Sequence, residues 1–556
     1  MSATRLQKGK TLIQERVLSY GHDMKTGAGS DDVIELTGND ITLEVLSRIS
    51  AGAKVVIPEE TIANLKKSRS IIDGIVEADA AVYGINTGFG LMSHTKIDIP
   101  DLHKLQANLI RSHASGVGTP LEPDVVRRIM ALRINVLARG HSGISLSTVQ
   151  VLVDMFNAGL TPEVPCQGTV GASGDLAPLA HVALGCMGEG KIHDPTVGKF
   201  VRARDALARH NITPAILGAK DGLSMVNGTQ FITGVGSGAL ENALKSCQAA
   251  QPVMALTLVA LHGHLNAFDH RVHEECRPHP GAAVVASCIR KLVPPESHHT
   301  TLNDVQDAYS LRCTPAVHGP ALEMLVTIRD TIEFEMNCST DNPLVLNKEE
   351  KCEFTGKMKP HLLSAGNFHG EYPAKALDTM VLYVGEIGRA SAARVSMLVD
   401  PSRNRELPAF LASDAGLDSG FMCWELTAAA LDAENRTLSM PASAETINTG
   451  AGKEDHVSMG GFGARKAVQV IENVQKIMTI ELMAGIHAVH RRIANTSGTP
   501  GTGKDFRLPP LLQRLFDKVA PMSPSMECDR YLKDDYDDLL HYVMHELPLD
   551  ADLVNP

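Results

Sequence analysis

Apolar residues recur at helical spacing through most of the chain, and this pattern predicts a protein built mainly from helices. Pro58, followed by two glutamates, predicts a helix start, because proline fits the first turn and acidic side chains favour its positive end. Strand-like stretches are short, at 33–37, 54–57 and 344–346. We expect a mainly α fold with a core of long, bundled helices. The further predicted helices are 101–114, 122–139, 145–158, 228–262, 316–335, 371–398 and 456–491.

The same pattern divides the 556 residues into three parts that form one functional unit. Residues 1–30 are mostly polar and predict a flexible tail. Residues 31–225 combine shorter helices with loops rich in glycine and proline, and residues 226–556 contain the long helices and further C-terminal helices. Loops of this kind often carry functional groups, so we expect the active site to depend on the region 31–225.

Composition and charge exclude several classes of function. The net charge of −12 argues against nucleic acid as a partner. The ten cysteines form no Cys-x-x-Cys pair, so no metal site is predicted. No apolar run is long enough to span a membrane, and no signal peptide is recognisable, so we expect a cytoplasmic protein without membrane contact. Residues 498–504 have some likeness to a phosphate-binding loop, but Asp505 stands where that motif needs Ser or Thr.

The segment 164–181, VPCQGTVGASGDLAPLAH, is the richest in potential chemistry. Three glycines, at 168, 171 and 174, allow a backbone that residues with side chains cannot adopt. A helical pattern begins directly afterwards, at Asp175, so the positive end of that helix would point at the tripeptide 172–174. A glycine-rich turn that caps a helix is the simplest interpretation of such a segment taken alone.

The tripeptide Ala172-Ser173-Gly174 has a second interpretation. In a tight bend, the nitrogen of Gly174 can attack the carbonyl carbon of Ala172, and loss of water then closes a five-membered ring. Loss of the Ser173 hydroxyl as a second water leaves an exocyclic methylene. The product, 4-methylidene-imidazol-5-one (MIO), is a strong electrophile, which no ordinary side chain provides.

The whole segment closely resembles the signature of the aromatic amino-acid lyases, the family of histidine, phenylalanine and tyrosine ammonia-lyases and related aminomutases. Thr169 departs from it, since many members have serine there, but the hydroxyl is kept. The resemblance extends from about residue 33 to beyond 490. It implies the long-helix bundle of the aromatic amino-acid lyase and fumarase-like type. It also implies self-made MIO without an external cofactor, and a homotetramer whose sites are each built from three chains. The GSSxMPxKxN signature of fumarase-type lyases themselves is absent.

Three further segments resemble site segments of this family. For Tyr83, in YGINTGFG, the resemblance implies a place in a mobile loop over the electrophile and an acid-base or positioning role. Asn227, in LSMVNGTQ, implies contact with the electrophile and with the amino-acid end of the substrate. Phe368, in SAGNFHG, implies a wall of the pocket, with Ala365 where many members have glycine. By composition alone, the three are a packing tyrosine, a helix cap and a core aromatic.

Gln306, Tyr309 and Arg312 occur in VQDAYSLRC and would share one face of a helix. An arginine in such a setting is commonly a surface ion-pair former. The segment resembles the carboxylate-binding segment of the family, so Arg312 is expected to hold the substrate carboxylate with a two-pronged hydrogen bond. Gln306 is expected to bind substrate, and Tyr309 is the first candidate for removing the β-proton.

Two positions bear on the substrate. Ser112-His113 occupies the two positions at which phenylalanine lyases have Phe-Leu and tyrosine lyases have His-Leu. The pair resembles that of the histidine-specific members. Glu454, in GKEDHVSMGG, replaces an amide that is usual in phenylalanine lyases. An imidazole ring needs polar partners, and a phenyl ring would leave a buried carboxylate unpaired.

We therefore expect the substrate to be L-histidine and the products trans-urocanate and ammonia. The alternative is a tyrosine or phenylalanine ammonia-lyase or 2,3-aminomutase of the same family. Two points stay open. The electrophile can react with the amine or with the ring of the substrate, and Glu454 competes with Tyr309 as the base.

Overall fold

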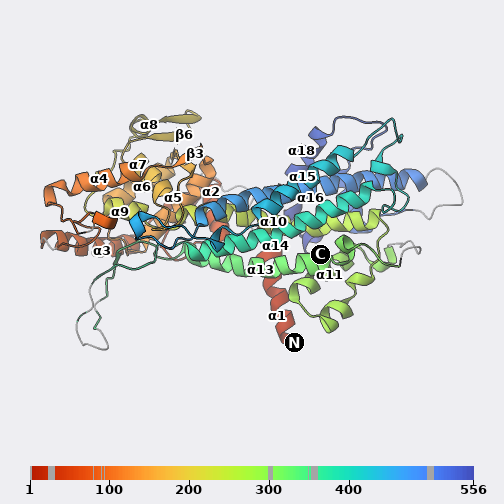
Figure 1. Ribbon diagram of the computed structural model, residues 1–556, viewed down its shortest axis with the longest axis horizontal. Coiled ribbons are helices and arrows are strands. Elements are labelled where there is room, and N and C mark those ends of the chain that lie inside the picture. Colours follow the sequence, from red (N-terminus) through yellow and green to blue (C-terminus); the bar gives the residue numbers. More distant parts are fainter. Residues whose placement is uncertain are drawn as a thin grey trace.

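The computed structural model describes residues 3–22, 32–78, 81–88, 90–92, 94–297, 305–348, 350–351, 358, 361–496 and 506–556. Long helices run side by side along the longest axis of the molecule and form its core (Figure 1). They confirm the expected mainly α fold with a bundle of long helices. The bundle consists of α10 (Gln230–Ala260), α13 (Thr314–Met336), α14 (Glu371–Val399) and α16 (Gly460–Thr496), with α15 (Met422–Leu438) beside α14 and α16.

The burial of side chains explains the arrangement of these helices. Almost every side chain of α10 is buried, as expected for a helix that is surrounded by others. Small residues allow close approach between neighbours: a Cβ added at Gly388 of α14 would lie 3.0 Å from Val474 of α16. On α15 only Ala428, Asp432 and Asn435 are buried.

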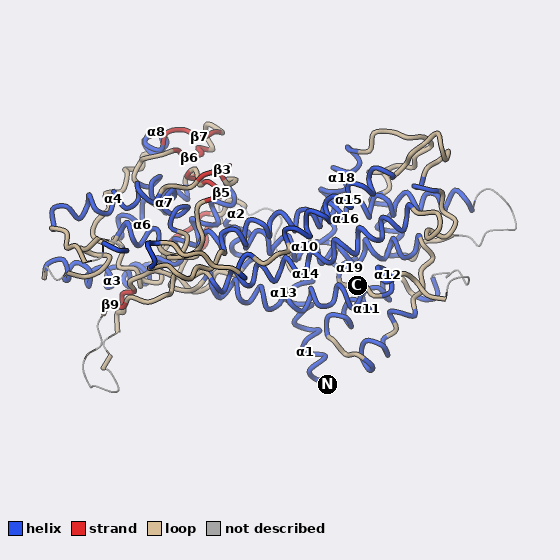
Figure 2. Tube along the Cα trace, in the orientation of Figure 1, coloured by secondary structure: helices blue, strands red, loops and turns tan. Residues whose placement is uncertain are grey.

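Shorter helices gather at one end of the bundle, on the left in Figures 1 and 2. They come from residues 43–226. These helices are α2 (Leu43–Ser50), α3 (Glu59–Glu77), α4 (Leu102–His113), α5 (Pro123–Ala138), α6 (Leu146–Asn157), α7 (Leu176–Cys186), α8 (Ala203–Arg209) and α9 (Asp221–Val226).

The strands form four small sheets within the described part of the chain. A parallel pair joins β1 (Val33–Glu35) to β2 (Lys54–Val56), with Ile34 opposite Val55. The remaining sheets are antiparallel: β3 (Val117–Pro120) with β5 (Pro165–Gln167); β4 (Thr161–Pro162), β6 (Lys191–Asp194) and β7 (Lys199–Arg202); and β8 (Leu344–Val345) with β9 (Leu362–Leu363). The pair β3–β5 leads directly into the segment that carries Ala172, Ser173 and Gly174.

The opposite end of the bundle holds a second group of helices. Among them, α12 is a single turn that directly precedes the long helix α13. The group comprises α11 (Pro280–Leu292), α12 (Tyr309–Arg312), α17 (Pro510–Val519), α18 (Lys533–His545) and α19 (Ala551–Val554). No helix in the described ranges is both long and apolar enough to cross a membrane.

The N-terminal residues differ from the flexible tail that we expected. Residues 3–18 form the helix α1 (Ala3–Ile13) and the π-helical turn η1 (Gln14–Leu18), and Val17 is fully buried. The side chain of Gln248, in α10, contacts the backbone carbonyls of Val17, Leu18 and Tyr20, that of Val17 at 3.0 Å. These partners lie more than 200 residues away, so a local pattern dominated by polar residues could not reveal them. Residues 1–2 and 23–30 of the predicted tail lie outside the described residues.

Candidate active site

The tripeptide 172–174 lies in a bend that has no room for larger residues. Gly174 has a left-handed backbone, with φ of +78°, and a Cβ there would lie 2.5 Å from the backbone nitrogen of Gly228. Gly171, with φ of +68°, would place a Cβ 2.2 Å from Oγ of Ser458. Only glycine fits both positions. A backbone held this tightly on both sides of Ala172 and Ser173 fits the requirement for ring closure between residues 172 and 174.

A buried carboxyl group ties this bend to the start of α10. Asp175 is fully buried and accepts hydrogen bonds from the backbone N–H groups of Phe231 and Ile232, at 3.0 and 2.9 Å. The hydroxyl of Thr169 donates to it at 3.1 Å and accepts the N–H of Gly171 at 3.0 Å. Burial raises the pKa of Asp175 to about 7, although these hydrogen bonds act in the opposite direction. The hydroxyl of Thr169 therefore links the backbone of Gly171 to Asp175.

Glu454 lies directly beside the tripeptide, although it is 281 residues away along the chain. The hydroxyl of Ser173 donates to Oε1 of Glu454 at 2.8 Å, and Thr449 donates to Oε2 at 2.8 Å. Burial raises the pKa of Tyr83, a backbone hydrogen bond of Gly90 opposes this, and the charge of Glu454 raises it further. Tyr83 therefore stays protonated and lies within electrostatic range of Glu454.

His113 also lies within electrostatic range of Glu454. Burial lowers the pKa of His113, while a hydrogen bond to Leu109 and the charge of Glu454 oppose that change. Its Nδ1 lies 2.9 Å from the carbonyl oxygen of Leu109. In the neutral ring this hydrogen bond assigns the proton to Nδ1, so Nε2 remains an acceptor. The structure thus brings together Tyr83, His113, Ser173 and Glu454.

Asn227 stands at the end of α9, next to the bend. Its side chain donates to the carbonyl oxygen of Asn342 at 2.9 Å. Its own carbonyl accepts a hydrogen bond from Arg133, a fully buried arginine that also contacts Gln230 at 2.6 Å. Asn227 is therefore fixed by contacts with two other parts of the chain. It is the C-terminal cap residue of α9, and α10 begins only at Gln230.

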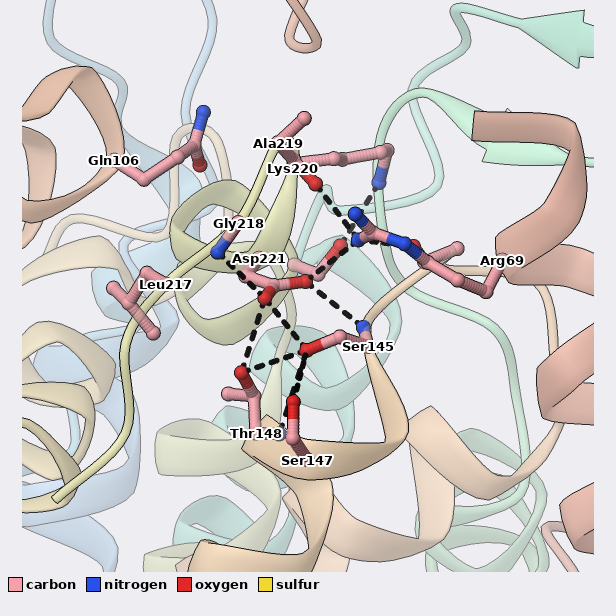
Figure 3. A network of polar contacts seen from close by, with 12 residues as sticks. Arg69, Gln106, Ser145, Ser147, Thr148, Leu217, Gly218, Ala219, Lys220 and Asp221 are labelled. Atoms are coloured by element: carbon pink, nitrogen blue, oxygen red, sulfur yellow. Dashed lines mark hydrogen bonds and ion pairs between the residues drawn. The ribbon is translucent and has the colours of Figure 1, made fainter. Parts of the chain in front are cut away.

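A second buried carboxylate fixes the helix that leads to Asn227 (Figure 3). Asp221 is fully buried and accepts hydrogen bonds from Arg69 at 3.0 Å, from the hydroxyl and backbone N–H of Ser145, from Thr148 and from the backbone of Gly218. Sequence reasoning missed Asp221 and Arg133. The available signal for Arg133 was a charged residue within an otherwise apolar stretch, because buried charges need several partners.

Phe368 is half-buried in a loop that lies against the Glu454 segment. The N–H of Ala365 donates to Oδ1 of Asn342 at 2.8 Å, and Asn342 also contacts Asn227. His369 donates from Nε2 to the carbonyl oxygen of His456 at 3.1 Å. The loop that carries Phe368 therefore connects Asn342 with the segment that holds Glu454.

The predicted carboxylate-binding segment lies far in space from the tripeptide 172–174 of the same chain. Tyr309 and Arg312 belong to α12 at the far end of the bundle (Figure 2). The helix α13 separates α12 from Asn342, and its 23 residues span roughly 35 Å at 1.5 Å per residue. One chain therefore does not bring Arg312 to its own electrophile segment. Gln306 lies outside the single turn of α12, so the predicted common helical face is only partly present.

Comparison with known proteins shows the family to which the chain belongs. The family model for aromatic amino acid lyases matches residues 41–507. The chain belongs to the aromatic amino acid lyase family. A histidine ammonia-lyase of Homo sapiens is 43% identical, over 90% of this chain and 74% of the relative. The crystal structure of histidine ammonia-lyase from Trypanosoma cruzi matches with a TM-score of 0.83 and 40% identity, over 94% of this chain and 95% of that chain. A tyrosine aminomutase from Streptomyces globisporus matches with a TM-score of 0.83 and 32% identity, over 93% of this chain and 98% of that chain.

This lyase has one group of possible metal ligands among the described residues. Ligand atoms of His369, Glu371 and His456 lie within 4.8 Å of one another. Two of these residues already have polar partners: His369 donates to the backbone of His456, and Glu371 pairs with Lys375 at 3.3 Å. The absence of a metal stays a prediction.

Proposed function

We propose that this lyase converts L-histidine to trans-urocanate and ammonia. The observation that carries the proposal is the hydrogen bond between Ser173 and Glu454, which places a carboxylate beside the tripeptide. An imidazole N–H needs an acceptor, and Glu454 together with the neutral ring of His113 offers polar partners for it. Thr449 satisfies Oε2 of Glu454, but a phenyl ring would offer no hydrogen-bond partner to Oε1 once the Ser173 hydroxyl has left, which favours histidine over phenylalanine. The names and identities of the relatives support the same substrate.

The electrophile in this proposal is MIO formed from Ala172, Ser173 and Gly174, without an external cofactor. When formed, it supplies an electrophilic methylene for the elimination. The left-handed backbone at Gly174 and the lack of space for side chains support this assignment. The helices α7 and α10 begin beside the bend, and their positive ends favour negative charge that develops there.

The remaining residues bind the substrate and move protons. Tyr83 is protonated at neutral pH and can donate a proton or a hydrogen bond, and Asn227 can contact the amino-acid end of the substrate. Arg312 binds the carboxylate, Gln306 assists binding, and Phe368 forms a wall of the pocket. Two groups compete for the β-proton: Glu454, which lies beside the tripeptide of its own chain, and Tyr309, which must come from another copy.

The working form in this proposal is a homotetramer with sites shared between chains. The separation of roughly 35 Å along α13 supports it, because Arg312 can reach an electrophile only in another copy. Large apolar side chains exposed on the bundle also support it. Examples are Phe334 and Tyr372, each 76% exposed, and Leu426, 62% exposed.

The test is to incubate the purified protein separately with L-histidine, L-tyrosine and L-phenylalanine and to record the ultraviolet absorbance of the unsaturated acid. We expect urocanate to form from histidine, with little product from the other two. Preferential conversion of tyrosine or phenylalanine would contradict the proposal and support the alternative lyase. Formation of a β-amino acid, detected by chromatography, would indicate a 2,3-aminomutase instead.

A further inference from the structure

Two buried ion pairs attach the segment that carries Tyr309 and Arg312 to the rest of the protein. The first involves Asp307, whose side chain is almost completely buried. Its Oδ1 accepts a hydrogen bond from Arg405 at 2.6 Å, and its Oδ2 accepts the backbone N–H of His264 at 2.6 Å. These contacts attach Asp307, two residues before α12, to Arg405 in the segment after α14 and to the loop that follows α10.

The second pair lies inside the bundle. Arg394 of α14 and Glu481 of α16 are 1% and 0% exposed, and they form a two-pronged contact with distances of 2.6 and 2.8 Å. Thr257 of α10 donates to the same carboxylate at 2.9 Å. The remaining contact of Arg394 goes to α12, where its Nη1 donates to the carbonyl oxygen of Ser310 at 3.1 Å. One guanidinium group thus connects α12 to the centre of the bundle.

Stability alone does not explain a charge pair at this position. Removing two charges from water is costly, and apolar residues of similar volume commonly replace a buried pair with no loss of stability. What an apolar pair cannot provide is a directed donor for the carbonyl of Ser310. Burial, with a smaller contribution from the charge of Arg394, lowers the pKa of His318 well below its usual value.

Arg312 is presented in a form that suits a carboxylate. Its guanidinium carbon lies 4.8 Å from the centre of the Tyr309 ring, and its buried Nε has no hydrogen-bond partner within the described part of the chain. A buried N–H without a partner is unfavourable unless another group satisfies it. Tyr309 itself is 70% exposed, so the face that carries both side chains is open to a neighbouring molecule.

We propose that Arg394 and Glu481 are positioning residues, which hold α12 so that Arg312 and Tyr309 meet the substrate in the site of another copy. Because it concerns how the substrate carboxylate is bound, this inference rests on the proposed function. Neither residue touches the substrate. They act through the carbonyl of Ser310, which belongs to the same helical turn as Tyr309 and Arg312.

The test replaces the pair with apolar residues of similar size, in the variant Arg394→Met/Glu481→Leu. The matched control is Arg128→Met/Glu241→Leu, which removes a buried pair with a 2.7 Å contact between α5 and α10 that does not touch α12. We expect the first variant to raise KM for L-histidine at least tenfold, and by a larger factor than kcat falls. The control should leave KM within about threefold of the unmodified protein. Both variants should keep the near-ultraviolet absorbance of the electrophile and the same oligomeric state.

Amide hydrogen exchange provides a measurement that does not depend on activity. In the first variant, peptides within 305–314 should exchange at least tenfold faster, while peptides from α10 stay unchanged. If that variant does not fold, Arg394→Lys decides by the same measurements, because lysine cannot reach Glu481 and Ser310 together. Unchanged KM and unchanged exchange, or equal effects of both double variants, would overturn the proposal. If the unmodified protein converts no amino acid, the proposed function fails, and exchange in 305–314 still decides whether the pair anchors α12.

Discussion

Ser173 is the residue whose side chain the proposed chemistry consumes. Its hydroxyl lies 2.8 Å from Glu454 and must leave as water if the tripeptide becomes an electrophile. The neighbouring Gly174 has no space for a Cβ. A small change of the Ser173 side chain should therefore abolish the chemistry and leave the fold intact.

We expect peptide mass analysis of the folded protein to show the loss of two waters within 172–174. Ser173→Ala should fold normally and lose nearly all activity, because no methylene can form without the hydroxyl. Thr169→Ser is the matched control, since it keeps the hydroxyl that contacts Asp175, and it should retain both the mass loss and the activity. An unmodified tripeptide in active protein would refute the mechanism.

Glu454 is expected to contribute more to the turnover of histidine than to that of phenylalanine. Glu454→Gln keeps the size and removes the charge, so kcat/KM for histidine should fall about tenfold or more, since a charge-assisted hydrogen bond is worth on the order of 1.5–3 kcal/mol. The weak turnover of phenylalanine should not fall in parallel. His113→Leu should shift selectivity in the same direction.

Steady-state kinetics with both amino acids separates the roles of Glu454. Unchanged histidine kinetics would remove the main physical support for the substrate. Equal losses with both amino acids would make Glu454 a general base or a structural residue.

At the scale of elements, the C-terminal helices attach to α16 through a buried histidine. Nε2 of His487 lies 3.0 Å from Oγ of Ser523, and that hydroxyl donates to Asp535 of α18 at 3.0 Å. Burial, assisted by the charges of His490 and Arg530, lowers the pKa of His487 to about 3. The folded state therefore holds this ring neutral, whereas the unfolded chain protonates it near pH 6.5.

This shift predicts a loss of stability in acid. Folding lowers the pKa of His487, so the neutral ring contributes stability to the folded state above pH 6.5, the pKa in the unfolded chain. This contribution is lost as the pH falls toward 3. Between pH 6.5 and 5.5, His487 should account for about 1 kcal/mol of lost stability per chain. Urea unfolding at both pH values and one protein concentration measures it. His487→Gln, which cannot be protonated, should show a smaller acid-induced loss than the unmodified protein, and an equal loss would contradict the prediction.

At the scale of the whole molecule, the proposed site is divided between the two ends of the bundle. The electrophile segment lies among the short helices at one end, and α12 lies at the other (Figure 2). Copies packed in opposite directions along their bundles would bring these ends together. The exposed apolar side chains of α13, α14 and α15 are suitable for such packing.

Mixed oligomers test this arrangement directly. Ser173→Ala and Arg312→Met should each be inactive alone, because every site then lacks one essential group. When the two variants are co-expressed in equal amounts, about a quarter of the sites should draw both intact groups from different copies and recover activity. Absence of recovery in verified mixed oligomers, or an active monomer in light scattering, would contradict shared sites.

The sequence by itself determined features that depend on neighbouring residues. Helical periodicity located the long helices to within a few residues: 371–398 was predicted and α14 is Glu371–Val399. The strand-like stretches 33–37 and 54–57 also coincide with β1 and β2 to within a few residues. The motif around Ala172, Ser173 and Gly174 also identified the family, because the special backbone of glycine and the tripeptide chemistry are local properties.

Only the tertiary structure decided which distant residues meet. It placed Glu454 on Ser173 across 281 residues, attached the N-terminal helix to α10, and assembled the buried networks around Asp221 and Arg394. It also placed Arg312 far from the electrophile segment of its own chain. The physical reason is that burial and hydrogen bonding depend on which surfaces pack together. A buried charge is stable only where several partners, drawn from separate elements, converge on it.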